Sequence, residues 1–358
     1  MPNYPAPPRT MMQFAARFAD DKTCADYLLS LRYPNGYVCK TCGSRRAWAC
    51  AQKPGMMICD AGHKVSVTAG TSLHRTKIPL HQWFYAAWLV ATLKPGISAL
   101  QFQRQMGFTR FETAFTMLHK LRAGLYAPDR EKLSSLNCDD PTHTDHWIEM
   151  DQMEIGGEQT RADRALHGSN KTIVMVAVEV HKWFGRLRRE DAVGSEGAEH
   201  ADGRKRQWHT RAGRCRMRLI GSHNTYNVHH FLDEYLTNGS TIATDAHASF
   251  NWVDARFRHR VTVAARDADP LPTLGRVAAN LLKWLNGTHK GAVSGQHLQA
   301  YLNEYVFRFN RRDIPWVAFN RALGLAALER DAIEYEGLYK HTWVHPNPAN
   351  FYRQGGLF

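Results

Sequence analysis

The sequence predicts an α/β protein in which a small cysteine-containing segment and a helical region precede a larger α/β core. Five of the seven cysteines lie within the first 60 residues. Helical patterns of apolar residues follow over residues 76–126, and strand-length apolar segments alternate with helical patterns over residues 145–315. Residues 316–358 predict a C-terminal helix and an irregular tail. With 358 residues, the chain is long enough for two or three domains and at least one sizeable core.

The charge balance predicts a polyanionic partner. The chain holds 46 Lys and Arg residues against 33 Asp and Glu, a formal net charge of +13, and nucleic acid is the commonest partner of such a basic protein. No apolar run approaches the roughly 20 residues of a membrane helix, and the N-terminus lacks the apolar core of a signal peptide. An odd number of cysteines suits a metal site in a reduced cytosol better than a disulfide framework. We therefore expect a cytoplasmic protein with no membrane partner.

Residues 1–75 predict a zinc-ribbon-like domain. Cys39-Lys-Thr-Cys42 is a CxxC motif, and Cys59-Asp-Ala-Gly-His63 follows it after 16 residues. The predicted structural Zn²⁺ ligands are Cys39, Cys42, Cys59 and His63. A regular second CxxC motif would need Cys at position 62, where this chain has Gly. Cys50 therefore stays open as the fourth ligand, and unliganded cysteines remain the alternative.

Residues 76–126 predict a helix-turn-helix region. Residues 79–90 place large apolar side chains on one helical face, and Ser98 is a candidate N-cap for a short helix that ends near Gly107. A longer basic helix follows the turn. The residues predicted to contact DNA phosphates here are Arg104, Arg110, Lys120 and Arg122. The alternative is an ordinary helical hairpin with a solvated basic face.

The α/β segment, residues 145–315, contains two aspartates that end strand candidates. The predicted strands are residues 146–151, 171–180, 184–189, 215–220 and 240–245, and the predicted helices are residues 227–236, 273–286 and 294–308. Residues 190–214 are expected to form an inserted loop. Asp151 and Asp245 each end a strand candidate, and Asn280 lies in a later helix.

Two carboxylates at one sheet edge repel each other until a divalent cation neutralises them, so such a pair usually serves a metal ion. Hard cations such as Mg²⁺ or Mn²⁺ need oxygen ligands, and a pair of them suits phosphoryl transfer. An RNase H-like core supplies this order, with one Asp on its first strand, one on its fourth and a third ligand on a later helix. Asp151, Asp245 and Asn280 follow this order, and Glu304 is a possible substitute for Asn280. The alternative for either aspartate alone is a strand-end residue that caps a turn.

Several basic residues near this predicted site could bind DNA. Asn280 is followed closely by a lysine, and the next helix ends in a run of arginines. The residues predicted to contact phosphates are Lys283, Arg308, Arg311 and Arg312. For any one of them, a solvated surface role is the alternative.

Short motifs spread over about residues 35–325 give the chain a recognisable resemblance. They are Ser66–Ser72, Pro95–Leu100, His119–Arg122, Asp151 with Ile155-Gly-Gly157, Thr244-Asp245, Asn280-Leu281, Trp284-Leu285, Gly287–His289, His297–Leu302 and Phe307–Arg312. In order and spacing the chain resembles bacterial insertion-sequence transposases of the ISXO-like type, which carry a zinc ribbon ahead of a DDE-type catalytic domain. The resemblance implies catalysis by Asp151, Asp245 and Asn280, cutting at terminal inverted repeats, and joining of the 3′-hydroxyl ends to target DNA. It also implies double-stranded DNA and a second copy of the chain as partners.

Three positions depart from the pattern of that family. Gln152 stands where Glu usually follows the first Asp, Leu282 stands where relatives with Asn at the third position often carry Lys, and Gly275 replaces a common His. These departures motivate a second hypothesis, a catalytically silent transposase that acts as a DNA-binding protein. A nuclease without strand transfer is a third hypothesis.

Overall fold

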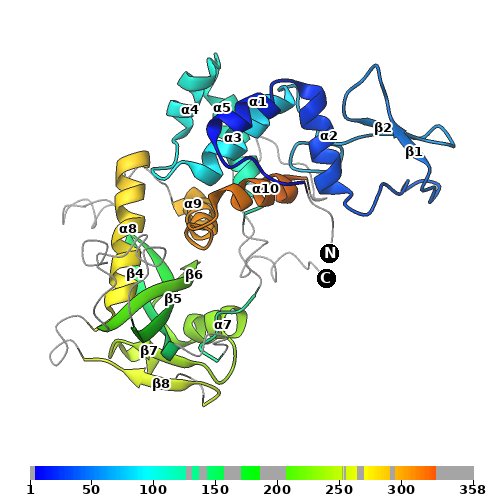
Figure 1. Cartoon of the computed structure of the whole chain (residues 1–358). Coiled ribbons are helices and arrows are strands. Elements are labelled where there is room, and N and C mark those ends of the chain that lie inside the picture. Colours follow the sequence, from blue (N-terminus) through cyan, green and yellow to red (C-terminus); the bar gives the residue numbers. More distant parts are fainter. Residues whose placement is uncertain are drawn as a thin grey trace. The chain divides into compact units, whose positions relative to one another are not determined.

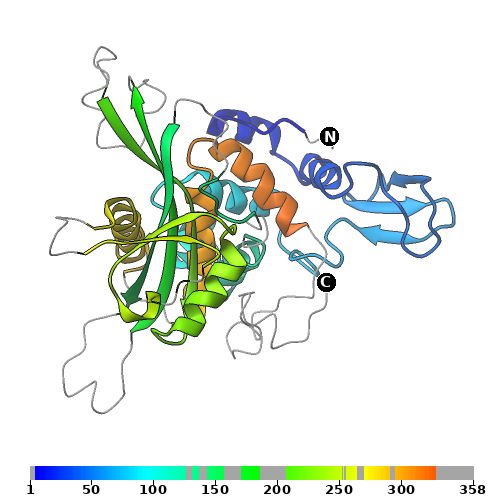
Figure 2. The ribbon, with the colours of Figure 1, turned by 90° about the horizontal axis from the view of Figure 1, so that it is seen from below.

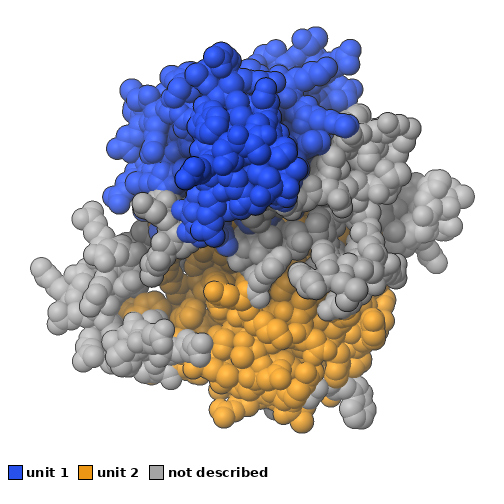
Figure 3. All heavy atoms as spheres, turned by 90° about the vertical axis from the view of Figure 1, so that its right-hand side faces the viewer, with its two compact units in different colours: residues 1–128, 314–346 blue, residues 129–313, 347–358 orange. Residues whose placement is uncertain are grey.

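The computed structural model describes residues 5–125, 131–136, 143–156, 171–185, 207–251, 253, 255–263, 270–290 and 295–327. The chain divides into two compact units, shown in different colours in Figure 3. Unit 1 comprises residues 1–128 and 314–346, and unit 2 comprises residues 129–313 and 347–358. Among the helices within these ranges, none combines the length and apolar character needed to span a membrane.

Unit 1 begins with two helices that the sequence analysis did not predict. These are α1 (Met11–Arg17) and α2 (Asp21–Arg32). Thr10 and Asp20 cap them, because their side chains accept hydrogen bonds from the N–H groups of Gln13 and Thr23. A small antiparallel sheet follows, visible as a separate element in Figure 2, with strands β1 (Ala47–Ala49), β2 (Met56–Cys59) and β3 (Lys64–Ser66).

The helical region of unit 1 agrees closely with the sequence prediction. It contains α3 (Leu80–Thr92), α4 (Ala99–Met106) and α5 (Phe111–Arg122). Ser98 caps α4 as predicted, since its side chain accepts from the N–H of Gln101. Gly107 ends α4 at φ 67°, a left-handed conformation that glycine adopts without strain. Residues 107–110 are thus the turn between two helices, as expected of a helix-turn-helix.

The C-terminal helix α10 (Pro315–Ala326) belongs to unit 1 although it follows unit 2 in the sequence. It packs against α2, α3 and α5. Phe319 of α10 lies in an aromatic cluster, with ring centroids 5.5 Å from Trp88 and 5.6 Å from Phe14. The predicted C-terminal helix is present, while the predicted tail after residue 327 lies outside the described residues.

Unit 2 is built on a five-stranded mixed sheet. Its strands are β4 (His143–Ile155), β5 (Thr172–Gly185), β6 (Gln207–Ile220), β7 (Thr241–Thr244) and β8 (Arg258–Val261), in the spatial order β6-β5-β4-β7-β8. β4, β5 and β6 are antiparallel neighbours, whereas β7 and β8 continue the sheet parallel to β4. The predicted mixed α/β architecture is therefore confirmed.

Helices cover both faces of this sheet (Figures 1 and 2). The helices α8 (Pro272–His289) and α9 (Gly295–Phe309) pack on one face through Leu274, Leu281 and Leu302. On the other face lie α7 (Thr225–Tyr235) and the short η3 helix (Ala248–Phe250), which bury Phe231 and Phe250. Successive side chains along a strand point to opposite faces of the sheet. Whether a residue has an even or an odd number (its parity) therefore decides, within one strand, which of the two cores its side chain enters.

Four sequence predictions for the sheet need correction. The strand expected over residues 146–151 runs from His143 to Ile155, so Asp151 lies within β4 and not at its end. Residues 171–180 and 184–189 were expected to be separate strands, but β5 runs without a break from Thr172 to Gly185, and residues 186–189 lie outside the described part. β6 begins at Gln207, so residues 207–214 are strand and not inserted loop, because they pair with the far half of β5. Residues 190–206 are not described. The edge strand β8 was missed, since Arg-His-Arg-Val has little apolar character.

Candidate active site

The register of the sheet brings Asp151 and Asp245 to adjacent positions. In the parallel pair of β4 and β7, Ile148 is opposite Ile242 and Glu149 is opposite Ala243. Continuing the same register by two residues places Asp151, which lies within β4, opposite Asp245, which directly follows β7. Neighbouring strands lie about 4.8 Å apart. The structure thus brings together the two aspartates that the sequence predicted at one sheet edge.

Both aspartates share the face that α8 covers. Ala243 contributes to the core under α8, and Asp245 has the same parity. Glu149 and Asp151 also share parity, and the buried Glu149 carboxylate accepts a 2.6 Å hydrogen bond from the N–H of Leu274 in the first turn of α8. Glu149 therefore attaches the N-terminus of this helix to the strand that carries Asp151. Sequence reasoning missed this role, although a glutamate two residues before Asp151 on one strand face was the available signal.

Burial and a neighbouring negative charge both disfavour the ionised form of the Asp151 carboxyl group. Burial, and to a smaller extent the negative charge of Asp245, raise its pKa to about 6. The N–H of Gln152 donates to Asp151 at 2.7 Å and partly offsets this effect. A divalent cation between the two carboxylates would remove the repulsion, so this pair fits the oxygen-rich environment that Mg²⁺ or Mn²⁺ requires.

Asp245 is oriented by the loop that follows it. The backbone N–H of His247 donates to an Asp245 side-chain oxygen at 3.0 Å. The preceding residue, Thr244, is fully buried, and its carbonyl accepts from the N–H of Thr262 at 2.8 Å. The end of β7 is therefore fixed on both sides, and the Asp245 carboxylate has a defined position.

A hydrogen-bond network on the other side of β4 connects the two aspartates. The Gln152 side chain donates to the Ser249 hydroxyl at 3.0 Å and accepts from Nδ1 of His223. Ser249 in turn contacts Nδ1 of His247 at 2.8 Å. The sequence analysis did not identify His223, His247 or Ser249, and only the closeness of His247 and Ser249 to Asp245 in the sequence could have pointed to two of them.

Asn280 and Lys283 lie on the exposed side of α8. Both side chains are exposed, and no contact among the described residues joins Asn280 to either aspartate. The first turn of α8 is attached beside Asp151 through the hydrogen bond between Glu149 and Leu274, and Asn280 follows Leu274 less than two turns later. The alternative third ligand, Glu304, is fully buried in α9 and lies 3.5 Å from Arg308. Asn280 therefore has the accessibility that a ligand needs, while Glu304 has an arginine partner inside the core.

The arginines at the end of α9 have structural partners. Arg312 donates to the carbonyls of Gly213 at 3.3 Å and Phe309 at 2.9 Å, and it also reaches the carbonyl of Ala212. Arg311 donates to its own helix at the Phe307 carbonyl, 3.1 Å away. The guanidinium of Arg312 thus holds the helix end to β6, and its contact with phosphate stays a prediction.

In unit 1, Cys39, Cys42, Cys59 and His63 converge as predicted. One ligand atom from each lies within 4.8 Å of all the others. The Sγ atoms of Cys42 and Cys59 are 3.7 Å apart, close to the roughly 3.8 Å expected between thiolates 2.3 Å from one tetrahedral zinc ion. Hydrogen bonding from the N–H of Cys42 lowers the pKa of Cys39 to about 6, which favours the metal-binding thiolate. The cluster therefore fits a structural zinc ion.

The irregular CxxxH spacing has a backbone explanation. The N–H of Gly43 donates to the carbonyl of Cys39, and that of Gly62 donates to the carbonyl of Cys59, both at 2.8 Å. Gly43 and Gly62 adopt φ values of 70° and 78°, so each turn ends on a left-handed glycine. His63 then provides a ligand one position later than a second cysteine would. The other candidate, Cys50, is not part of the cluster.

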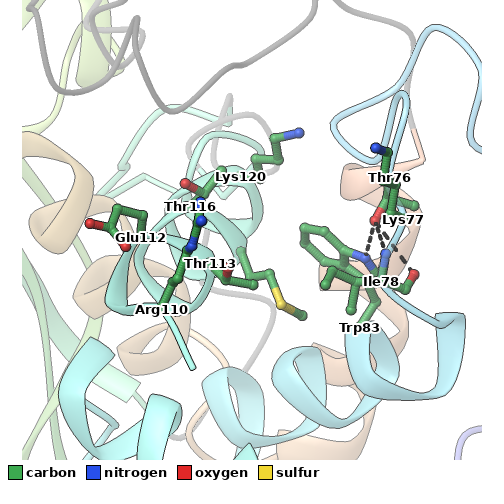
Figure 4. A pocket seen from close by; sticks show the side chains of 10 residues that line it. Thr76, Lys77, Ile78, Trp83, Arg110, Glu112, Thr113, Thr116 and Lys120 are labelled. Carbon is green, nitrogen blue, oxygen red and sulfur yellow. Dashed lines mark hydrogen bonds between the residues drawn. The ribbon is translucent and has the colours of Figure 1, made fainter. Parts of the chain in front are cut away.

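A groove of about 630 Å³ borders the helix-turn-helix (Figure 4). α5 and the residue before it form one side, and the segment leading into α3 forms the other. The lining residues are Thr76, Lys77, Ile78, Trp83, Arg110, Glu112, Thr113, Thr116, Met117 and Lys120. Arg104 and Arg110 are exposed and Lys120 is half-buried. In contrast, Arg122 is fully buried, so the prediction that it contacts DNA phosphates is wrong.

Comparison with known proteins gives one family match, which lies within unit 2. Residues 144–310 match the family model described as the ISXO2-like transposase domain. This match covers β4 through α9 and confirms, over that segment, the resemblance to insertion-sequence transposases. No curated protein and no solved structure matches the chain.

Proposed function

We propose that this chain, which carries an ISXO2-like transposase domain, is a metal-dependent DNA transposase. Asp151 and Asp245 would hold Mg²⁺ or Mn²⁺, and Asn280 would supply the third, uncharged oxygen ligand. The register of β4 and β7, which two residues further along brings Asp151 within β4 opposite Asp245 just after β7, is the observation that supports this proposal most strongly.

The sheet supports an RNase H-like core for unit 2. In sequence order its strands lie as 3-2-1-4-5, with the first three antiparallel and the last two parallel to the first. The two aspartates then belong to strands one and four, and Asn280 belongs to the helix that follows strand five. This arrangement is the one in which the sequence analysis expected a two-metal site.

The proposed reaction cuts DNA at the terminal inverted repeats and joins the freed 3′-hydroxyl to target DNA. Bound divalent ions would supply Lewis acidity at the attacking and leaving oxygens. Asp151 must lose its proton before it can act as a ligand, and with a pKa raised to about 6 it is still mostly deprotonated near neutral pH. The backbone N–H groups of Gln152 and His247 keep the two carboxylates oriented for this task.

Unit 1 would bind the DNA end. A structural zinc ion would hold the small sheet, and the helix-turn-helix would present Arg104, Arg110 and Lys120 to phosphates. The transposase family implies DNA as the partner. Because two DNA ends have to be held together, we also propose that copies of the chain associate on DNA.

A plasmid-nicking assay tests the proposal. A supercoiled plasmid that carries the gene with its flanking DNA is incubated with the full chain and Mg²⁺ or Mn²⁺. Asp151→Asn and Asp245→Asn are expected to abolish nicking. Asp233→Asn is the matched control, because Asp233 is an exposed acid paired with Arg256. Equal nicking by all of these variants would refute the proposal.

The products separate the transposase from its two alternatives. Pre-cut ends that are joined to target DNA indicate a transposase, whereas cleavage without joined product indicates a nuclease. Binding to the DNA ends that persists in EDTA, without cleavage under any divalent ion, would indicate the silent DNA-binding protein.

A further inference from the structure

The imidazole of His247 is held in one orientation beside the two aspartates. Its backbone N–H donates to a side-chain oxygen of Asp245 at 3.0 Å. Its side chain caps η3, since Nδ1 accepts from the backbone N–H of Ser249 at 3.2 Å. The residue as a whole is exposed. Hydrogen bonds to Nδ1 therefore fix the orientation of the ring, and the rest of the ring is accessible to a substrate.

The hydrogen bonds also define the tautomer of this ring. A backbone N–H can only donate, so Nδ1 of His247 must carry a lone pair. The Gln152 amide donates to the Ser249 hydroxyl, which leaves the hydroxyl proton to donate to the same Nδ1 atom, 2.8 Å away. With Nδ1 as the acceptor, the proton of the imidazole lies on Nε2. Nε2 is on the side of the ring that faces away from Ser249.

We propose that His247 is a further catalytic residue, whose Nε2–H donates a hydrogen bond to a non-bridging oxygen of the scissile phosphate. Gln152 and Ser249 are positioning residues that fix the ring through Nδ1. This inference rests on the proposed function, because the substrate is the phosphodiester beside Asp151 and Asp245. A fixed donor aimed at a phosphate oxygen stabilises the charge that develops there during displacement.

The inference also explains the departure at Gln152. A glutamate at this position has no proton to donate, so the Ser249 hydroxyl would have to turn toward it and away from His247. The glutamine amide can donate to Ser249 and accept from His223 at the same time. Gln152 therefore supports a histidine donor that a glutamate would leave less well oriented.

Two substitutions at His247 separate the two nitrogens of the ring. His247→Asn keeps an acceptor near the Nδ1 position and remains a good cap for η3, but it has no group at the Nε2 position. His247→Gln places an amide N–H near the Nε2 position and loses the short cap. Three quantities are measured for both variants and for the unchanged full chain. They are the single-turnover rate of plasmid nicking with Mg²⁺, the affinity for Mn²⁺, and the DNA concentration that gives half of the maximal rate.

The expected result is a loss of rate without a loss of binding. His247→Asn should nick about 100-fold more slowly at saturating DNA, as when one transition-state donor is removed, with unchanged Mn²⁺ affinity and DNA half-saturation. His247→Gln should recover a large part of that rate. If His247 serves only as a cap, the order is reversed: His247→Asn nicks at the normal rate and His247→Gln is impaired.

A normal rate for His247→Asn alone overturns the inference, whether or not His247→Gln folds. The proposed function is judged separately by Asp151→Asn. If the unchanged chain nicks, Asp151→Asn does not, and His247→Asn nicks normally, then only the role of His247 is wrong. If Asp151→Asn nicks normally, the proposed function itself is wrong.

Discussion

The Cys-His cluster of unit 1 and the aspartate pair of unit 2 are two candidate metal sites built in opposite ways. In unit 1, four ligand atoms converge within 4.8 Å, and Cys39 and Cys59 are almost completely buried. In unit 2, Asp151 in β4 lies opposite Asp245, which directly follows β7, while Asn280 is exposed on the helix α8. The first site has a complete tetrahedral set, and the second leaves coordination positions open for a substrate.

This difference explains what each site contributes. The small three-stranded sheet of unit 1 buries only Cys59 among the ten residues of its strands, so a metal ion is needed to hold its two turns together. The aspartates of unit 2 lie on a sheet that is already stabilised by apolar cores on both faces. We therefore expect loss of metal to unfold the first site and to leave the second folded but inactive.

Cys59→Ser should give the largest effect on stability. Cys59 is fully buried and contacts both Cys42 and His63, so its loss breaks the cluster at its centre. Structural zinc sites are worth on the order of 10 kcal/mol in isolated zinc-finger peptides. We expect one zinc ion per chain in the unchanged protein by elemental analysis, and none in the variant, with loss of the β1–β3 sheet by NMR.

Cys50→Ser is the matched control for the zinc site. Cys50 lies outside the cluster and hydrogen-bonds to Gln52. The variant should keep its zinc ion and its melting temperature. Loss of zinc in Cys50→Ser and retention in Cys59→Ser would show that the ligand set has been assigned wrongly.

Glu149→Ala should destabilise unit 2 by about 2–3 kcal/mol. The substitution removes the acceptor of the Leu274 N–H and leaves this buried donor without a partner. Glu149→Gln keeps an acceptor oxygen and should cost less. Chemical denaturation followed by tryptophan fluorescence measures both values. Equal stability of the alanine variant and the unchanged chain would contradict the role of Glu149 in attaching α8.

Asp151→Asn should stabilise the metal-free protein by on the order of 1 kcal/mol at pH 7.5. Because the pKa of Asp151 is raised from 3.8 to about 6, protonation favours the folded state, and this contribution disappears as the pH rises through about 6. The neutral side-chain amide of the variant carries no charge at either pH, so the variant does not lose this stability as the pH rises. Thermal unfolding at pH 5 and pH 7.5 should show the difference between variant and unchanged chain only at the higher pH. A variant that is less stable at pH 7.5 would contradict the assigned repulsion.

Arg110→Ala should give the smallest effect, a few-fold loss of affinity for DNA. One exposed arginine neutralises about one phosphate, so the slope of log affinity against log salt should fall by about 1. Fluorescence anisotropy with duplex DNA at several salt concentrations measures this slope. An unchanged slope would remove Arg110 from the DNA-binding surface.

The sequence predicted the elements whose pattern is local. The helices of residues 80–92 and 99–122 follow from apolar spacing and from the Ser98 cap, and the core strands follow from their apolar runs. The edge strand β8 was missed because its residues are mostly basic, and only its pairing with β7 makes it a strand. β5 was divided in two because the polar residues His181 and Lys182 interrupt its apolar run.

At the candidate site, the sequence predicted the residue types but not their partners. Asp151 and Asp245 could be found because each ends an apolar segment of strand length, although β4 continues beyond Asp151 to Ile155. The buried state of Arg122 and the carbonyl partners of Arg312 depend on tertiary packing, which no local pattern records. The same holds for the link from Gln152 through Ser249 to His247, whose members come from separate segments.

Location of bound manganese tests the central claim most directly. Crystals of the full chain with Mn²⁺, measured by anomalous diffraction, should show an ion coordinated by both Asp151 and Asp245. The ion should be absent in crystals of Asp245→Asn grown under the same conditions. Manganese bound elsewhere in unit 2, or the two carboxylates occupied by no ion at saturating Mn²⁺, would contradict the proposed catalytic site.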